Sequence, residues 1–161
     1  MPVTSDIVAT YRGPGRVVRR LLEMGPREDR VLAFVMIGCA LVFIGHMPLQ
    51  ARTAHLMDQE LNSLLAGSLY AWLLGAPLLL YLLAGISHLI LRMFGGSGDW
   101  YGARLALFWA FLAASPVMLL RGLVAGFIGP GLALNCIGAA WWVVFLWFWL
   151  SGLRQTQRRA E

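Results

Sequence analysis

Long stretches without charge, separated by short polar connections, dominate the pattern of this chain. The clearest runs from Leu61 to Leu91, thirty-one residues without Asp, Glu, Lys or Arg, and three comparable stretches fill most of the remainder. An α-helix rises about 1.5 Å per residue, so about 20 apolar residues cross a bilayer core of about 30 Å. The pattern predicts an all-α integral membrane protein, a bundle of about four transmembrane helices with spans near residues 31–47, 61–91, 101–128 and 132–153.

Residues that favour helix ends or bends flank and interrupt these spans. Glu28 and Asp29 suit the positive end of the first helix dipole, and Pro48 is predicted to close that span. Gly95-Gly96 is predicted to stop the second span, which is longer than one crossing needs. Pro116 is predicted to bend the third span; the alternative splits that span at the proline and gives five spans.

Composition and charge agree with a single membrane domain in a bacterium. Charged residues make up 13% of the chain and apolar residues 59%, against about 25% charged in an average soluble domain. All thirteen basic residues are arginine, a bias typical of GC-rich coding. Six precede the first span, two lie between the second and third, and three follow the fourth, whereas the other two connections hold only Arg52 and Arg121.

This alternation of arginine content predicts the topology. By the positive-inside rule, both termini lie in the cytoplasm and the protein resides in a bacterial inner membrane. The chain then divides into a cytoplasmic N-terminal segment (1–30), a transmembrane domain (31–153) and a basic cytoplasmic tail (154–161).

Residues 16–24 are amphipathic at helical spacing. This pattern predicts a cytoplasmic interfacial helix lying flat on the membrane surface. Its arginines are the candidate contacts to anionic lipids or a partner; alternatively, they only fix the topology. Gly13-Pro14-Gly15 is predicted to break any preceding helix and to place Tyr11 and Arg12 in a turn. One face carries Val17, Val18, Leu21 and Leu22, and the other Arg16, Arg19, Arg20 and Glu23.

Small residues at four-residue spacing mark candidate helix contact faces. In lipid, small side chains allow the close backbone approach through which helices associate. Internal packing is the favoured interpretation, and a seam between two copies is the alternative, which leaves a homo-oligomer possible. The positions are Gly67, Ala71 and Gly75 in the second span, and Ala106, Ala110, Ala114, Gly122 and Gly126 in the third.

Residues capable of catalysis or ligation are few and dispersed. His46 is predicted at the outer end of the first span and His88 at the cytoplasmic end of the second, which argues against a bis-histidine haem. His46 and His55 lack the further ligands of a metal site. We therefore predict no catalytic, cofactor or metal site, and we expect no nucleic-acid partner.

Arg121 is the one charge close to a span interior, which makes it a functional candidate by default. Structural anchoring is the favoured interpretation, in which Arg121 extends to headgroups or pairs with Asp58 or Glu60. In the fourth span, Trp141 and Trp142 are adjacent in sequence. For this pair, aromatic packing is the favoured interpretation, and a lipid or quinone site is the alternative.

The segment from Leu89 to Pro116, LILRMFGGSGDWYGARLALFWAFLAASP, resembles the bacterial branch of the Yip1 family. The resemblance rests on an apolar helix that ends in Phe-Gly-Gly, a Gly-containing turn, and a helix with an Ala-rich stretch before a proline. It implies a multi-pass membrane protein; family members usually have five spans, and the bacterial relatives look non-enzymatic. Phe94, Gly95, Gly96, Gly98, Ala113, Ala114 and Pro116 carry the pattern.

Together these features favour a non-catalytic inner-membrane protein that acts as an adaptor, accessory subunit or membrane organiser. Its expected partners are the lipid bilayer, anionic lipids and other membrane proteins. The alternative is a small oligomeric transporter or channel component, with Arg121, Ser87 or Asn135 lining the path.

Overall fold

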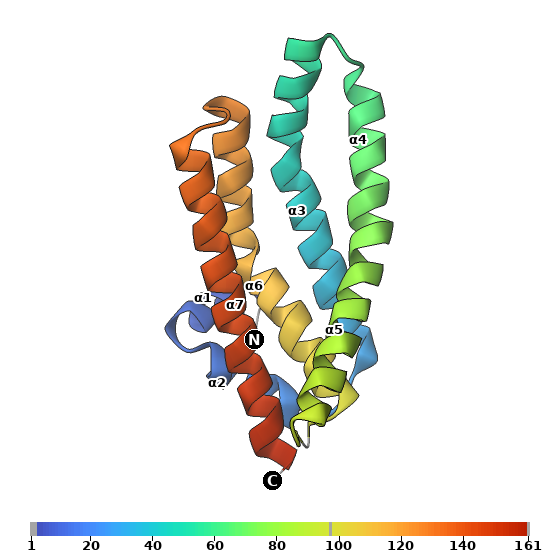
Figure 1. Ribbon diagram of the computed structural model, residues 1–161, viewed down its shortest axis with the longest axis vertical. Helices are drawn as coiled ribbons and strands as arrows, with labels where there is room; N and C mark the ends of the chain where they lie inside the picture. The colour runs from blue at the N-terminus through green and yellow to red at the C-terminus, as the bar shows by residue number, and fades with distance from the viewer. Residues whose placement is uncertain (1–2, 97, 161) are drawn as a thin grey trace.

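The computed structural model describes residues 3–96 and 98–160, and every regular element in this part of the chain is a helix (Figure 1). The predicted all-α class is therefore confirmed. In chain order the helices are α1 (Val3–Arg12), α2 (Pro14–Glu23), α3 (Glu28–Met57), α4 (Leu61–Tyr70), the π-helical turn η1 (Ala71–Gly75), α5 (Ala76–Met93), α6 (Trp100–Phe127) and α7 (Leu132–Ala160).

In the part of the chain that the structure describes, four helices are long and apolar enough to cross a membrane, as predicted. The second is continuous through α4, η1 and α5, and its 33 residues correspond to about 50 Å of helix, well beyond a core of about 30 Å. In Figure 1 the α5–α6 turn and the C-terminus lie at the same end of the bundle, and α1 and α2 lie against that half. The candidate spans are Glu28–Met57, Leu61–Met93, Trp100–Phe127 and Leu132–Gln157.

Pro48 does not close the first span, contrary to the prediction. The helix α3 continues past it to Met57, and Asp58 in the left-handed conformation (φ 52°) ends it. Pro48 has no N–H for the carbonyl of Ile44, yet membrane helices tolerate such a proline where a neighbouring helix packs against it. Here α6 does so at Gly126, where an added Cβ would lie 2.4 Å from Pro48 Cβ.

Helix α6 occupies the centre of the bundle. It packs against α3, α5, α7 and both N-terminal helices, and its residues from Tyr101 to Ser115 are almost all buried. Pro116 lies inside this single helix, which bends in Figure 1 between its yellow and orange parts. The alternative of five spans, split at this proline, is therefore not adopted.

The spans α3 and α6 make a close backbone contact at two glycines. A Cβ added to Gly122 would lie 1.7 Å from the carbonyl oxygen of Gly45, so only glycine fits there. Nearer the start of α6, Ala106 faces Gly152 of α7, where an added Cβ would lie 3.0 Å from Ala106 Cβ. Ala110 and Ala114 are likewise fully buried. Small residues on α6 thus let two helices come close on different faces.

The small residues of the second span are not internal packing positions, which corrects the favoured interpretation. Ala71 is exposed, and nothing lies within 4 Å of a Cβ added to Gly67 or Gly75. The helix α4 has no buried residue. The periodicity alone cannot distinguish a face covered by the chain from one that faces outward.

Gly122→Ala should lower the free energy of unfolding by about 1–3 kcal/mol, because the added methyl group forces α3 and α6 apart. Gly67→Ala is the matched control, since its added methyl group meets open space. Thermal unfolding in a mild detergent, followed by circular dichroism, compares the two variants. Equal melting temperatures for both would contradict the assigned contact.

Candidate functional site

The helices α1 and α2 form an N-terminal hairpin, which is attached to the bundle by hydrogen bonds of Thr10, Tyr11 and Leu21. Gly13 separates the helices and Pro14 begins α2, as the Gly-Pro-Gly sequence predicts. Tyr11 and Arg12 belong to the last turn of α1 rather than to a turn between helices, because α1 remains helical up to the residue before Gly13.

The end of α1 is attached to α6 by two hydrogen bonds. The Trp109 indole N–H donates to Thr10 Oγ1 over 3.1 Å, and the same hydroxyl donates to the Asp6 carbonyl over 2.7 Å. Tyr11 donates its phenolic O–H to the Ala113 carbonyl at 3.0 Å. Ala113 is the residue after Leu112. The Leu112 carbonyl receives no helical hydrogen bond from position 116, because Pro116 has no N–H.

Tyr11 suits this role because its phenol stays protonated. Burial raises the pKa of Tyr11 above its ordinary value, since desolvation disfavours the phenolate. Its ring also packs edge-on against Phe148 of α7, with 5.0 Å between ring centroids. The residue therefore joins α1 to both α6 and α7.

The apolar face of α2 is covered by the bundle, not by lipid. All four of its apolar side chains are at most 4% exposed, and α2 packs mainly against α7. The expected helix lying flat on the membrane is thus replaced by a helix docked on the protein. The amphipathic pattern requires an apolar cover, but it does not specify which one. The four residues are Val17, Val18, Leu21 and Leu22.

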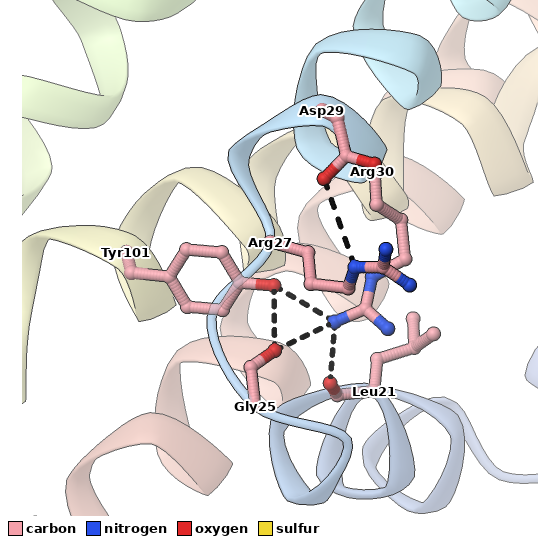
Figure 2. A network of polar contacts seen from close by, with 6 residues as sticks. All are labelled: Leu21, Gly25, Arg27, Asp29, Arg30 and Tyr101. Carbon is pink, nitrogen blue, oxygen red and sulfur yellow. Dashed lines mark hydrogen bonds and ion pairs between the residues drawn. The ribbon is translucent and has the colours of Figure 1, made fainter.

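Arg30 holds the end of α2 in place (Figure 2). Its Nη2 donates to the carbonyls of Leu21 at 2.9 Å and Gly25 at 3.0 Å, and lies 2.9 Å from the Tyr101 hydroxyl. The Leu21 carbonyl is in the last turn of α2, where helical partners run out and a cation is favourable. Arg30 of α3 therefore links the α2 end, the α2–α3 turn and α6.

Ion pairs add to this arrangement. Arg20 pairs with Asp6, which joins α2 to α1, and Arg104 of α6 pairs with Glu28 of α3. On the exposed side of α2, Arg19 pairs with Glu23 at 3.0 Å. Two of the four predicted contact arginines thus have intramolecular partners, whereas Arg16 and Arg121 form no ion pair within residues 3–96 and 98–160.

The α5–α6 turn explains the glycines of the sequence motif. Gly95 has φ 81°, and the N–H groups of Gly95 and Gly96 bond the carbonyls of Arg92 at 3.1 Å and Leu91 at 2.8 Å, a Schellman helix end. The Gly98 N–H donates to Gln157 Oε1 at 3.1 Å, and an added Cβ there would lie 2.7 Å from Gln157 Nε2. Phe94, in contrast, is 85% exposed. The glycines let the turn lie directly against the end of α7.

Arg121 lies beside α7 rather than beside the acidic α3–α4 turn. Its Nε is 3.3 Å from the position of a Cβ on Gly138, and it forms no ion pair with Asp58 or Glu60 in the described structure. Arg52 instead reaches the end of α6 and donates to the Gly126 carbonyl at 3.2 Å.

The predicted histidine and serine candidates serve local packing. His46 Nδ1 lies 2.9 Å from the Val42 carbonyl, and its ring packs against Trp72. The ring of His88 lies 4.1 Å from Trp100, between centroids, and Ser87 donates to a carbonyl of its own helix. Among the residues that the structure describes, no group of three His, Cys, Asp or Glu side chains could hold a metal ion.

The aromatic side chains of α7 stack on one another. Trp141 and Phe145 are stacked at 5.3 Å, and Phe145 and Trp149 at 5.8 Å. Trp141 packs against the buried core, whereas Trp142 is 56% exposed.

Sequence reasoning missed the residues that attach the hairpin to the bundle. Thr10, Trp109 and Tyr101 had no assigned role, and Arg30 counted only toward topology. One local pattern indicates a contact of Thr10: Asp6 lies four residues before it, a spacing that places both on one helical face. Their partners are about 70 to 100 positions away in the chain, which no local pattern reveals.

The comparison with protein families gives one match over nearly the whole chain. A family model described as Yip1 domain matches residues 8–160, a range that includes the end of α1, α2 and all four candidate spans. No curated protein and no solved structure gives a significant match.

Arg30→Gln should release α2 from the bundle, since three polar contacts of one guanidinium are lost. Hydrogen bonds to charged groups contribute about 1.5–3 kcal/mol each, so amide exchange in α2 should accelerate about tenfold or more, measured by mass spectrometry. Arg27→Gln is the control, because Arg27 makes only an exposed 3.9 Å pair with Asp29. Equal acceleration in both variants would argue against the anchoring role.

Proposed function

The chain belongs to the Yip1 domain family, and from this we propose that it is a non-catalytic adaptor, accessory subunit or membrane organiser of the bacterial inner membrane. It is a multi-pass membrane protein with four candidate spans. In this proposal it acts through lateral helix–helix and lipid contacts, with both termini in the cytoplasm.

The outward face of the second span is the observation that carries the proposal. Along this face Gly67 and Gly75 leave open space, and Ala71 is exposed between them. Small residues in lipid favour close approach of another helix. Since no helix among the described residues 3–96 and 98–160 occupies the face, a helix of another protein or of a second copy is the occupant that we propose.

The use of the polar side chains also supports a non-catalytic role. Thr10 accepts a hydrogen bond from Trp109, and Tyr11 and Arg30 donate to main-chain carbonyls, so these polar groups attach the hairpin to the bundle. The transporter alternative gains no support, because Ser87 bonds the Leu83 carbonyl at 2.6 Å and Arg121 lies along α7.

Reporter fusions test the proposed topology. The C-terminus and the α3–α4 turn lie at opposite ends of the bundle (Figure 1), and the arginine content assigns the C-terminal end to the cytoplasm. Alkaline phosphatase should therefore be active when fused after Gln59 and inactive when fused after Glu161. Activity at both positions, or the reverse pattern, would refute this orientation.

Gly67→Leu combined with Gly75→Leu tests the lateral contact. Both side chains enter open space, so insertion and thermal stability should be unchanged. The variant should lose co-purifying membrane proteins, or its own dimer, by about tenfold, which corresponds to about 1.4 kcal/mol of packing. Ala139→Leu on the exposed face of α7 is the control. An unchanged set of co-purifying proteins after mild-detergent purification would reject the face as the contact surface.

A further inference from the structure

Three adjoining surface hollows surround the Gly13-Pro14-Gly15 turn. Their volumes are about 320, 310 and 250 Å³. The first and second share Gly13 and Arg16, and the second and third share Gly15 and Gln155. We call them together the arginine groove. Its basic lining residues are Arg12, Arg16, Arg19, Arg20 and Arg154, and no acidic residue is among the described lining residues.

The charge of the groove is only partly neutralised by the protein itself. Of its five arginines, Arg19 and Arg20 have acidic partners. The other three, Arg12, Arg16 and Arg154, form no ion pair within residues 3–96 and 98–160. Like charges gathered at one place repel each other unless an anion lies among them.

Local backbone geometry shapes the groove. Gly13 separates the C-terminus of α1 from the N-terminus of α2 and provides no side-chain cap, so opposite ends of two helix dipoles meet there and the arginine side chains supply the positive charge. The absence of a side chain at Gly13 also makes room for Arg16, whose Nε lies 2.8 Å from the position of an added Cβ.

The groove lies at the depth where a membrane-spanning helix leaves the apolar core. Arg154 comes 22 residues after Leu132, where the fourth candidate span begins, which corresponds to about 33 Å along the helix. Trp147, 50% exposed, lines the third hollow, and tryptophan is typical of the interface. Toward the membrane centre, α7 exposes Val143, Leu146 and Leu150. A cationic groove thus continues into an apolar helix face.

We propose that the arginine groove binds the phosphate-bearing headgroup of an anionic phospholipid, whose acyl chains lie along the exposed face of α7. This proposal specifies the lipid contact of the function proposed above and rests on it. The apolar continuation favours a lipid over a soluble phosphate, because only a lipid fills both parts. The hairpin then presents its charged face to the leaflet, while its apolar face stays on the protein.

Native mass spectrometry of the full chain in mild detergent tests the proposal, with phosphatidylglycerol and phosphatidylcholine of equal acyl chains as probes. The parent protein should retain phosphatidylglycerol preferentially. Arg12→Gln with Arg16→Gln should weaken that retention about tenfold or more, because each arginine near an anionic headgroup contributes to attraction. Arg27→Gln with Arg92→Gln removes the same charge outside the groove and should retain the lipid.

Gly13→Ala gives a second variant without a change of charge. Its added methyl group displaces only the flexible Arg16 side chain, and its φ of −175° suits alanine, so the fold should persist while phosphatidylglycerol retention falls several-fold. Unchanged retention in both groove variants would overturn the site.

Two further results would also overturn the proposal: equal retention of phosphatidylcholine, or displacement of the lipid by soluble glycerol phosphate at similar concentration. The co-purifying membrane proteins are identified in the same preparations. If lipid preference is absent while these proteins remain and depend on Gly67 and Gly75, the lipid site is wrong and the proposed function stands. If the preference is present but the proteins are independent of those glycines, the lipid site stands and the lateral contact is wrong.

Discussion

The backbone contact between α3 and α6 is the constraint on which the rest of the structure depends. Lipid tails are as apolar as leucine, so helices in a bilayer gain little by hiding apolar surface and must gain by close packing instead. Gly122 against the Gly45 carbonyl and Gly126 against Pro48 provide that approach. With α6 fixed in this position, its remaining faces receive α7 at Ala106 and the N-terminal hairpin at Trp109.

Hydrogen bonding determines where the hairpin docks. The face of α6 that meets α1 offers an indole N–H at Trp109 and a carbonyl at Ala113, and buried polar groups without partners are costly. Thr10 and Tyr11 meet that need at adjacent positions of α1. Hydrophobic contact of α2 with α7 adds area, and Arg30 fixes its end. The docked geometry leaves Arg12 and Arg16 on the outside of the protein.

The sequence was sufficient for the features that local chemistry determines. Uncharged length predicted the four spans, Gly95-Gly96 predicted the end of the second, and Gly13-Pro14 predicted the break before α2. It was insufficient wherever a distant partner decides. Pro48 is accommodated by Gly126, about 80 positions away, and the apolar face of α2 suits lipid and protein equally well. Which small residues face inward likewise depends on which helix packs beside them, and that helix is distant in the sequence.

The contact of α2 with α7 brings together the first and last parts of the chain, and this has a consequence for biosynthesis. Gly15 lies against Gln155, and Val18 lies close to Gly152, so the hairpin cannot reach its docked position before the final helix has left the ribosome and inserted. Until then, Val17, Val18, Leu21 and Leu22 have no protein cover, and a truncated chain would keep this apolar face exposed. Burial of the amphipathic helix thus distinguishes a molecule in which α7 has been inserted from one in which it has not, the kind of difference that chaperones and membrane proteases recognise.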